Sequence, residues 1–162
     1  MDNLKNKKIL LCVTGSIAAY KACEFIRLLK KQDCHVQVVM SQSSQNFIGK
    51  LTLASLSDNE VLTDKEQSGL EHVKFAIEYD AIIVLPATAN ILCKSAGGIA
   101  DDIVSTVLSI CEQPKLFVPA MNFRMWQSKA TQQAVKTLKA NNIHVMDPEE
   151  GYLASLHKGE GR

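Results

Sequence analysis

The segment from Lys8 to Thr14 (KILLCVT) is a largely apolar run that ends at a Gly–Ser step. A run without polar–apolar alternation is typical of a strand that is buried on both faces in a parallel sheet. The next stretch, from Ile17 to Lys31, repeats apolar residues at helical spacing. Together these two segments predict a strand, a tight glycine turn and a helix, which is the repeating unit of an α/β domain.

The same alternation continues along the chain. Further strands are expected at Val36 to Met40, Ala81 to Leu85 (ended by Pro86), Leu116 to Val118 (ended by Pro119) and Ile143 to Met146. Further helices are expected at Gln45 to Leu56, Thr88 to Ala96, Asp101 to Cys111 and Gln127 to Ala140, followed by a polar loop from Asp147 to Arg162. This order predicts a doubly wound α/β domain of the Rossmann-like or flavodoxin-like type with a mostly parallel sheet.

Length and charge narrow the class of protein. At 162 residues the chain is long enough for about one domain. Its net charge of +1 provides no broad field for a nucleic acid or an anionic membrane. The longest apolar runs, Ile9 to Val13 and Ala81 to Leu85, are far shorter than the ~20 residues of a membrane span. We therefore expect neither a nucleic-acid partner nor a membrane partner. The five-residue apolar run after the polar N-terminus is too short for the h-region of a signal peptide, so we expect a cytoplasmic location.

The chain has five cysteines, an odd number, and none of them forms a CxxC pair. Reduced thiols are therefore expected rather than a disulfide framework or a zinc site. The four histidines show no ligand spacing, so no metal site is predicted.

Small and hydroxylic residues follow the first two predicted strands, as Gly15-Ser16-Ile17 and as Ser41 to Ser44. In doubly wound sheets, ligands bind outside the carboxyl ends of the strands. Free backbone N–H groups and hydroxyls at such ends can bind a phosphate without Lys or Arg. Plain turn and helix-cap chemistry is the alternative for each loop alone. Neither the GxGxxG nor the GxxxxGK[ST] pattern is present, which argues against a standard dinucleotide site or P-loop.

Three other positions carry side chains with more than one possible role. Histidine side chains ordinarily change charge near neutral pH, so His72 is the first candidate acid or base, although a lone histidine is more often a surface or packing residue. Asn122, after a predicted strand, can bind a carboxylate or cap a helix. Asp101 and Asp102 can form a carboxylate pair, or they can complement the dipole of the helix that follows them.

Taken jointly, these segments resemble the homo-oligomeric flavin-containing cysteine decarboxylases, and within that family the phosphopantothenoylcysteine decarboxylases of coenzyme A biosynthesis. The resemblance is collinear from about Ile9 to Arg162. The segments that carry it are Gly15 to Lys21, Ser41 to Ser44 with Phe47-Ile48, His72-Val73, Pro86 to Asn90, Gly98 to Asp102, Pro119 to Asn122 with Met125-Trp126, and Gly159 to Arg162.

The resemblance implies FMN as the cofactor. On the family pattern the phosphate and ribityl chain are held by Gly15, Ser16, Ile17, Ser41 and Ser43, and the isoalloxazine lies near Thr88, Ala89, Asn90, Ile91 and Ala120. The family's active-site histidine corresponds to His72, and its carboxylate-binding asparagine corresponds to Asn122. Met125 and Ala154 correspond to substrate-binding positions. The family also implies self-association as a trimer or a dodecamer, with the flavin site completed by a neighbouring subunit.

The implied reaction explains the need for a flavin. A cysteinyl carboxylate has no β-carbonyl to accept the electrons left by departing CO2. Oxidation of the Cβ–S bond to a thioaldehyde, with hydride transfer to FMN, creates that acceptor. The resulting enethiolate is then reduced to a saturated thiol. In this scheme Asn122 orients the carboxylate and His72 assists proton transfer or substrate placement.

One departure from the family pattern concerns the substrate flap. The coenzyme A branch usually has Ala-Cys-Gly there, whereas this chain has Ala154-Ser155-Leu156. A serine hydroxyl is a much weaker acid than a thiol. Three outcomes fit: full decarboxylation with another proton donor, arrest at the enethiol as in lantibiotic peptidyl-cysteine decarboxylases, or an engineered trap. Full decarboxylation is favoured, because Gly15 to Lys21 and Pro119 to Asn122 follow the coenzyme A branch.

Other functions also fit these residues, both within the same class of enzyme and outside it. The same FMN chemistry could act on a C-terminal peptidyl cysteine, or the chain could be a non-catalytic FMN-binding regulatory subunit. Such eukaryotic relatives carry long acidic tails that this sequence lacks. A flavin prenyltransferase has a similar fold without the histidine and Pro-Ala-Met-Asn signatures. Family members continue past the Gly-x-Gly-Arg segment, often into a ligase domain, so Arg162 is expected to be a truncation or the edge of a longer protein.

Overall fold

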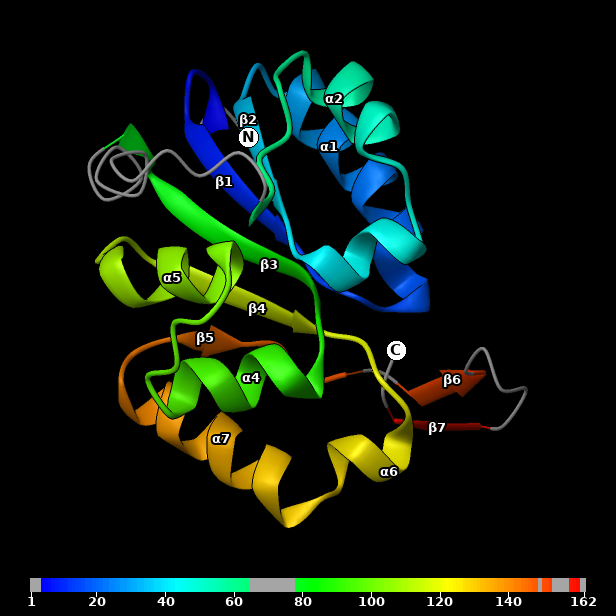
Figure 1. Ribbon diagram of the computed structural model, residues 1–162, viewed down its shortest axis with the longest axis vertical. Coiled ribbons are helices and arrows are strands. Elements are labelled where there is room, and N and C mark those ends of the chain that lie inside the picture. Colours follow the sequence, from blue (N-terminus) through cyan, green and yellow to red (C-terminus); the bar gives the residue numbers. More distant parts are fainter. Residues whose placement is uncertain (1–3, 65–77, 149, 153–157, 161–162) are drawn as a thin grey trace.

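A computed structural model describes residues 4–64, 78–148, 150–152 and 158–160 (Figure 1). Its centre is a five-stranded sheet in the order β2-β1-β3-β4-β5. The strands are β1 (Lys8–Val13), β2 (His35–Met40), β3 (Ala81–Ala87), β4 (Lys115–Pro119) and β5 (His144–Val145). Each neighbouring pair is parallel, which confirms the doubly wound α/β prediction.

Helices cover both faces of this sheet (Figure 1). On one face lie α1 (Lys21–Lys31) and α2 (Lys50–Ser57), and on the other lie α4 (Ala89–Ala96), α5 (Ile103–Ile110) and α7 (Lys129–Ala140). Alternate residues of β1 point to opposite faces, so Leu11 packs in the core with α1 while Leu10 packs in the core with α5. Both faces are therefore buried, which explains why β1 is an uninterrupted apolar run.

Strand β3 does not end before Pro86, as expected from the sequence, but continues to Ala87. Its register against β4 is irregular between Val84 and Ala87. Proline has no N–H to donate to the ladder, so a strand can include it where the pairing is already interrupted.

Two predicted helices begin later than expected. The segment predicted as one helix from Ile17 starts with a 3₁₀ turn, η2 (Ile17–Tyr20), before α1. The helix predicted from Gln45 begins only at Lys50, the first residue of α2, because the 3₁₀ turn η3 (Gln42–Asn46) precedes it. Serine side chains cap both turns, and they hold the backbone in a short tight turn before the α-helix can begin.

The predicted helix from Gln127 begins instead at Lys129, because Ser128 caps α7 through the N–H of Thr131. A separate short helix, α6 (Phe123–Trp126), comes before it. The expectation of a plain loop after Asp147 is wrong. The strands β6 (Glu150–Tyr152) and β7 (Lys158–Glu160) form an antiparallel pair in which Gly151 lies opposite Gly159.

All five cysteines are free thiols, as predicted, and Cys12, Cys34 and Cys111 are buried. Within residues 4–64, 78–148, 150–152 and 158–160, no helix is long and apolar enough to cross a bilayer.

Candidate functional site

Four loops gather at the carboxyl edge of the parallel sheet, where each strand gives way to a helix or a 3₁₀ turn (Figure 1). They are the β1–η2 loop, the β2–η3 loop, the β3–α4 loop and the β4–α6 loop. These loops contain the predicted cofactor residues Gly15, Ser16, Ile17, Ser41, Ser43, Thr88, Ala89, Asn90, Ile91 and Ala120, counting the first residues of the helices that follow.

The first two loops meet at Gly15. A Cβ atom at this position would lie 2.5 Å from Oγ of Ser43 and 3.1 Å from its carbonyl carbon. Contacts this short do not occur for real side chains, so only glycine lets the two loops approach so closely. The loops that the sequence predicted to share a phosphate site are therefore in direct contact.

The β2–η3 loop offers hydrogen-bond donors without any cation. The hydroxyls of Ser41 and Ser43 lie 3.2 Å apart, and the Ser41 hydroxyl accepts a bond from the N–H of Ser44. The N–H groups of Gln42 and Ser43 precede the first bond of the turn, and neither has a partner within the described part of the chain. An anion beside Gly15 would find these free donors.

Ser16 connects the first loop to the fourth. Its hydroxyl donates to the carbonyl of Ala120 (3.2 Å) and accepts from the N–H of Ala18 (3.3 Å). Its own N–H donates to the carbonyl of Thr14 at 3.0 Å. The polar groups of Ser16 thus join the ends of β1 and β4, which a sequence pattern could not show.

Thr14 connects the first loop to the third, and sequence reasoning did not include it among the site residues. This residue is 3% exposed. Its hydroxyl donates to the carbonyl of Pro86 (2.6 Å) and accepts from the N–H of Thr88 (3.3 Å). The one available signal was a hydroxyl at the end of an apolar strand, immediately before Gly15.

The third loop leads into α4, whose first residues are Ala89, Asn90 and Ile91. The Thr88 hydroxyl caps this helix by accepting the N–H of Ile91 at 3.4 Å. The N–H groups of Ala89 and Asn90 lie before the first helical bond and face the same edge of the sheet as the other loops.

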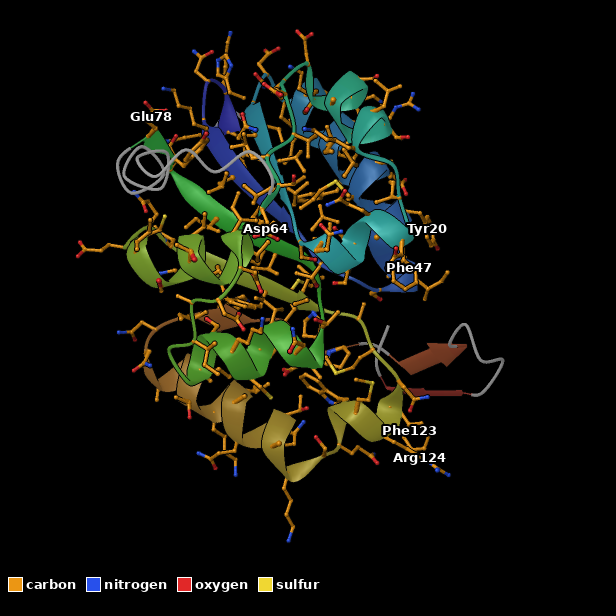
Figure 2. All side chains as sticks on the ribbon, in the orientation of Figure 1. Tyr20, Phe47, Asp64, Glu78, Phe123 and Arg124 are labelled. Atoms are coloured by element: carbon orange, nitrogen blue, oxygen red, sulfur yellow. The ribbon has the colours of Figure 1, made fainter. Side chains whose placement is uncertain are left out.

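Asn122 caps α6, and this cap uses only one end of its amide. Its Oδ1 accepts from the N–H of Arg124 at 2.9 Å, which leaves Nδ2 available as a donor. The two readings of Asn122, helix cap and carboxylate ligand, are therefore compatible. Met125 belongs to the same short helix and is 49% exposed, and the neighbouring Phe123 and Arg124 lie on the side of α6 near β6 and β7 (Figure 2).

Asp101 and Asp102 have a structural role. Asp102 forms a capping box with Ser105 at the start of α5, and Lys94 on α4 bonds both carboxylates. The expected placement at the start of a helix is found for Asp102, the N-cap residue of α5, and its interaction with the helix dipole stays a prediction. Three predicted residues, His72, Ala154 and Ser155, lie outside the described residues.

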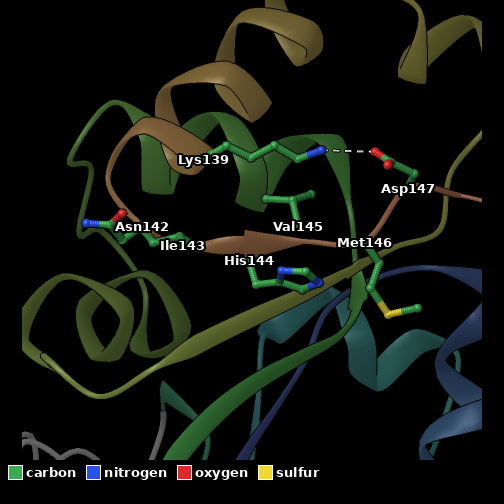
Figure 3. Close-up of a pocket in the computed structure, with 7 residues that line it drawn as sticks. All are labelled: Lys139, Asn142, Ile143, His144, Val145, Met146 and Asp147. Carbon is green, nitrogen blue, oxygen red and sulfur yellow. Dashed lines mark hydrogen bonds and ion pairs between the residues drawn. The ribbon is translucent and has the colours of Figure 1, made fainter.

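A pocket of about 580 Å³ lies elsewhere, along the edge strand β5 (Figure 3). The pocket is lined by Lys139, Asn142, Ile143, His144, Val145, Met146 and Asp147, and none of these belongs to the four loops. The candidate site is therefore an open array of loops rather than this pocket.

Comparison with curated proteins gives relatives that match almost the whole chain. The chain is 42% identical over 163 residues to the coenzyme A biosynthesis bifunctional protein CoaBC of Bacillus subtilis (strain 168), covering 98% of this chain and 40% of that protein. The chain thus spans about two fifths of the length of the curated relatives it matches.

Two solved structures share the whole fold. A crystal structure of the FMN-dependent cysteine decarboxylase SpaF has a TM-score of 0.87 at 26% identity, covering 98% of this chain and 91% of that one. A cysteine-to-serine mutant of PPC decarboxylase complexed with pantothenoylaminoethenethiol has a TM-score of 0.86 at 27% identity, covering 97% and 90%. The flavoprotein family model matches residues 1–162. With this match across the chain and the loops arranged as described, the protein belongs to the flavoprotein family.

Proposed function

We propose that the four loops bind FMN. The phosphate and ribityl chain fit the first two loops, at Gly15, Ser16, Ile17, Ser41 and Ser43. The ring system fits the third and fourth loops, near Thr88, Ala89, Asn90, Ile91 and Ala120. Support comes from the close approach of Gly15 to Ser43 beside free N–H and hydroxyl donors, since such groups bind phosphate without a cation.

We propose that the reaction is the decarboxylation of 4'-phospho-N-pantothenoylcysteine to 4'-phosphopantetheine in coenzyme A biosynthesis. The observation that carries this proposal is the 42% identity to CoaBC over 98% of the chain. Bound FMN would accept and return a hydride, which provides the electron sink that this carboxylate lacks.

The protein's own residues would bind and orient the substrate. Nδ2 of Asn122 has no hydrogen-bond partner among the described residues, so it would be available to donate to a carboxylate while Oδ1 serves the cap of α6. Met125 and Ala154 would contact the substrate, and His72 would hold or move a proton near it. Fixing the carboxylate in one orientation favours loss of CO2 over side reactions.

The serine at position 155 bears on the product. The solved PPC decarboxylase whose cysteine is changed to serine is complexed with an aminoethenethiol. We propose that this chain nevertheless completes the reaction, with a proton donor other than Ser155, because the sequence around Gly15 and Asn122 follows the coenzyme A branch.

A spectrum and a product mass test these proposals. The purified protein is expected to be yellow and to convert phosphopantothenoylcysteine to a product lighter by CO2 alone. Loss of CO2 plus two hydrogens would show arrest at the enethiol. Turnover of a peptide with C-terminal cysteine, but not of phosphopantothenoylcysteine, would select the peptidyl-cysteine reading. Flavin binding without turnover of either would select a regulatory subunit, and absence of flavin would overturn the whole proposal.

We further propose that the chain associates with copies of itself as a trimer, or as a dodecamer of trimers, in the cytoplasm. Four large apolar residues lie exposed on the elements that follow the first two loops. These residues, the apolar cluster, are Ile17, Tyr20, Phe47 and Leu51, with exposures of 60%, 61%, 47% and 79%. Tyr20 and Phe47 both lie at the same side of the molecule in the view of Figure 2. Exposed apolar groups of this kind mark interaction surfaces, which supports self-association.

The proposed cytoplasmic location is supported by the five free thiols, which are typical of a reducing compartment.

A further inference from the structure

Thr14 occupies a particular position between two of the four loops. It is the residue before Gly15, and its hydroxyl uses both its donor and its acceptor capacity on the end of β3 and the β3–α4 loop that follows it. The hydrogen goes to the carbonyl of Pro86 at 2.6 Å, and the oxygen receives the N–H of Thr88 at 3.3 Å. One hydroxyl therefore holds backbone groups on both sides of Ala87.

The loop held in this way leads directly to the residues proposed to face the flavin ring. Thr88 caps α4, so the direction in which Ala89 and Asn90 leave the sheet depends on where the Thr88 backbone lies. The Ala87 carbonyl in turn accepts the N–H of Ala120 at 3.1 Å. A shift of the Pro86 to Thr88 backbone would consequently move the third and fourth loops together.

We propose that Thr14 is a positioning residue for the flavin ring, and this inference rests on the proposed FMN site. Its hydroxyl sets the backbone of the β3–α4 loop so that Thr88 to Ile91 face the cofactor. Thr14 does not touch the flavin. Thr14 is 3% exposed, and its bond to the Pro86 carbonyl is buried while its bond to the Thr88 N–H is partly buried. A residue of the same shape without a hydroxyl therefore leaves both backbone groups without this partner, at a site where little water can replace it.

The test uses two ligands to separate the ring from the phosphate. Bound flavin is first removed from the full chain. The apoprotein is then titrated with FMN or with riboflavin, and the dissociation constants are measured by fluorescence. Thr14→Val should weaken both ligands by the same factor, about tenfold, which is about 1.4 kcal/mol. Gly15→Ala should weaken FMN far more than riboflavin, because its new Cβ displaces Ser43 on the phosphate side.

Two variants control for a purely structural effect. Thr14→Ser retains the hydroxyl and should bind both flavins within about twofold of the parent chain, since the hydrogen bonds persist. Thr131→Val removes a buried hydroxyl that is bonded to Ser128 at 2.9 Å on α7, outside the four loops. It should lower thermal stability without changing either dissociation constant. If Thr14→Val does not fold, Thr14→Ala takes its place.

The outcomes separate this inference from the proposed function. A parent chain that binds no FMN would refute the function itself. Parent binding with unchanged flavin affinity in the Thr14 variant would overturn the positioning role, and so would a loss confined to FMN with riboflavin unaffected. The inference is supported when Thr14→Val loses affinity for both ligands by the same factor. Thr14→Ser and Thr131→Val should then bind both ligands like the parent chain.

Discussion

At the scale of single residues, Asn122 shows how one side chain can serve the fold and a ligand together. Its Oδ1 accepts the N–H of Arg124 and so fixes the orientation of the amide. The opposite end of the amide, Nδ2, can only donate. The requirement of the helix cap therefore turns a donor outward, which is the polarity that a carboxylate needs.

Replacing Asn122 by Asp separates these two roles. An aspartate keeps the cap, because its oxygen can still accept the N–H of Arg124. It also puts a negative charge where the substrate carboxylate is proposed to bind. We expect turnover to fall by at least about 100-fold, or about 2.7 kcal/mol, with flavin content and melting temperature close to those of the parent chain. Steady-state kinetics beside an absorbance spectrum measure this, and retained activity would remove Asn122 from the site.

Sequence patterns predicted that the first two loops share a site, because both combine a strand end with small or hydroxylic residues, and the two loops do meet at Gly15 and Ser43. These patterns did not identify Thr14, because its role depends on Pro86 and Thr88, which lie 72 and 74 residues further along the chain. Contacts at this separation follow from the order of strands in the sheet, and a single sequence does not reveal which loop will lie opposite which.

At the scale of elements, the start of α5 is held by a compact polar network. Asp102 caps the helix through the N–H of Ser105 at 2.8 Å and also bonds Lys94 at 2.7 Å. Partial burial acts to raise the pKa of the Asp102 carboxyl, but the hydrogen bonds from Lys94 and Ser105 outweigh it and hold the pKa below its ordinary value. This network joins α4, which begins at the candidate site, to α5.

Asp102→Ala should lower the free energy of unfolding by about 1–2 kcal/mol, because it removes the cap. The folded-state pKa lies below that of the unfolded chain, so this stabilisation is complete above the unfolded pKa of about 3.9 and is lost as the pH falls through the folded pKa. Urea unfolding at pH 7 and at decreasing pH should therefore show the difference between the two chains shrinking in acid.

Asp147→Ala serves as the control for Asp102→Ala. It removes an exposed ion pair with Lys139. The side chain of Asp147 is 83% exposed and that of Lys139 is 46% exposed. Such pairs contribute about 0–1 kcal/mol. Equal effects of the two substitutions at pH 7 would contradict a special contribution from the Asp102 cap.

The order of strands and helices followed from apolar periodicity, whereas several boundaries did not. Serine caps delayed the first two helices after their strands, and periodicity does not register a 3₁₀ turn. The β6–β7 pair was missed because its three-residue strands are polar and glycine-containing. A strand of that length shows no alternation to detect, and its pairing depends on the partner strand.

At the scale of the whole molecule, the candidate site is open to one side, where the apolar cluster lies on the elements after the first two loops. A flavin bound at these loops would leave part of its surface uncovered by the loops that hold it. A neighbouring copy placed over the cluster would bury both the apolar residues and the exposed side of the cofactor.

Leu51→Glu tests this arrangement, because a charge inside an apolar interface is costly to bury. We expect the variant to have a lower molecular mass in light scattering and to release flavin more readily. Leu4→Glu is the matched control. Leu4 is 41% exposed and lies near the amino ends of β1 and β2, away from the candidate site. Its carbonyl there accepts a hydrogen bond from the Cys34 thiol. A parent chain that is monomeric with full flavin would contradict the proposed assembly.

The hydrogen bond from Ser16 to Ala120 spans 104 residues of sequence. A chain still being synthesised possesses the first loop long before it possesses the fourth, so the site cannot close until β4 has been made and has paired with β3. At the proposed FMN site, flavin uptake would accordingly follow the synthesis of β4. The yellow colour of the protein would then report that a molecule has been completed through that strand, which shorter translation products cannot imitate.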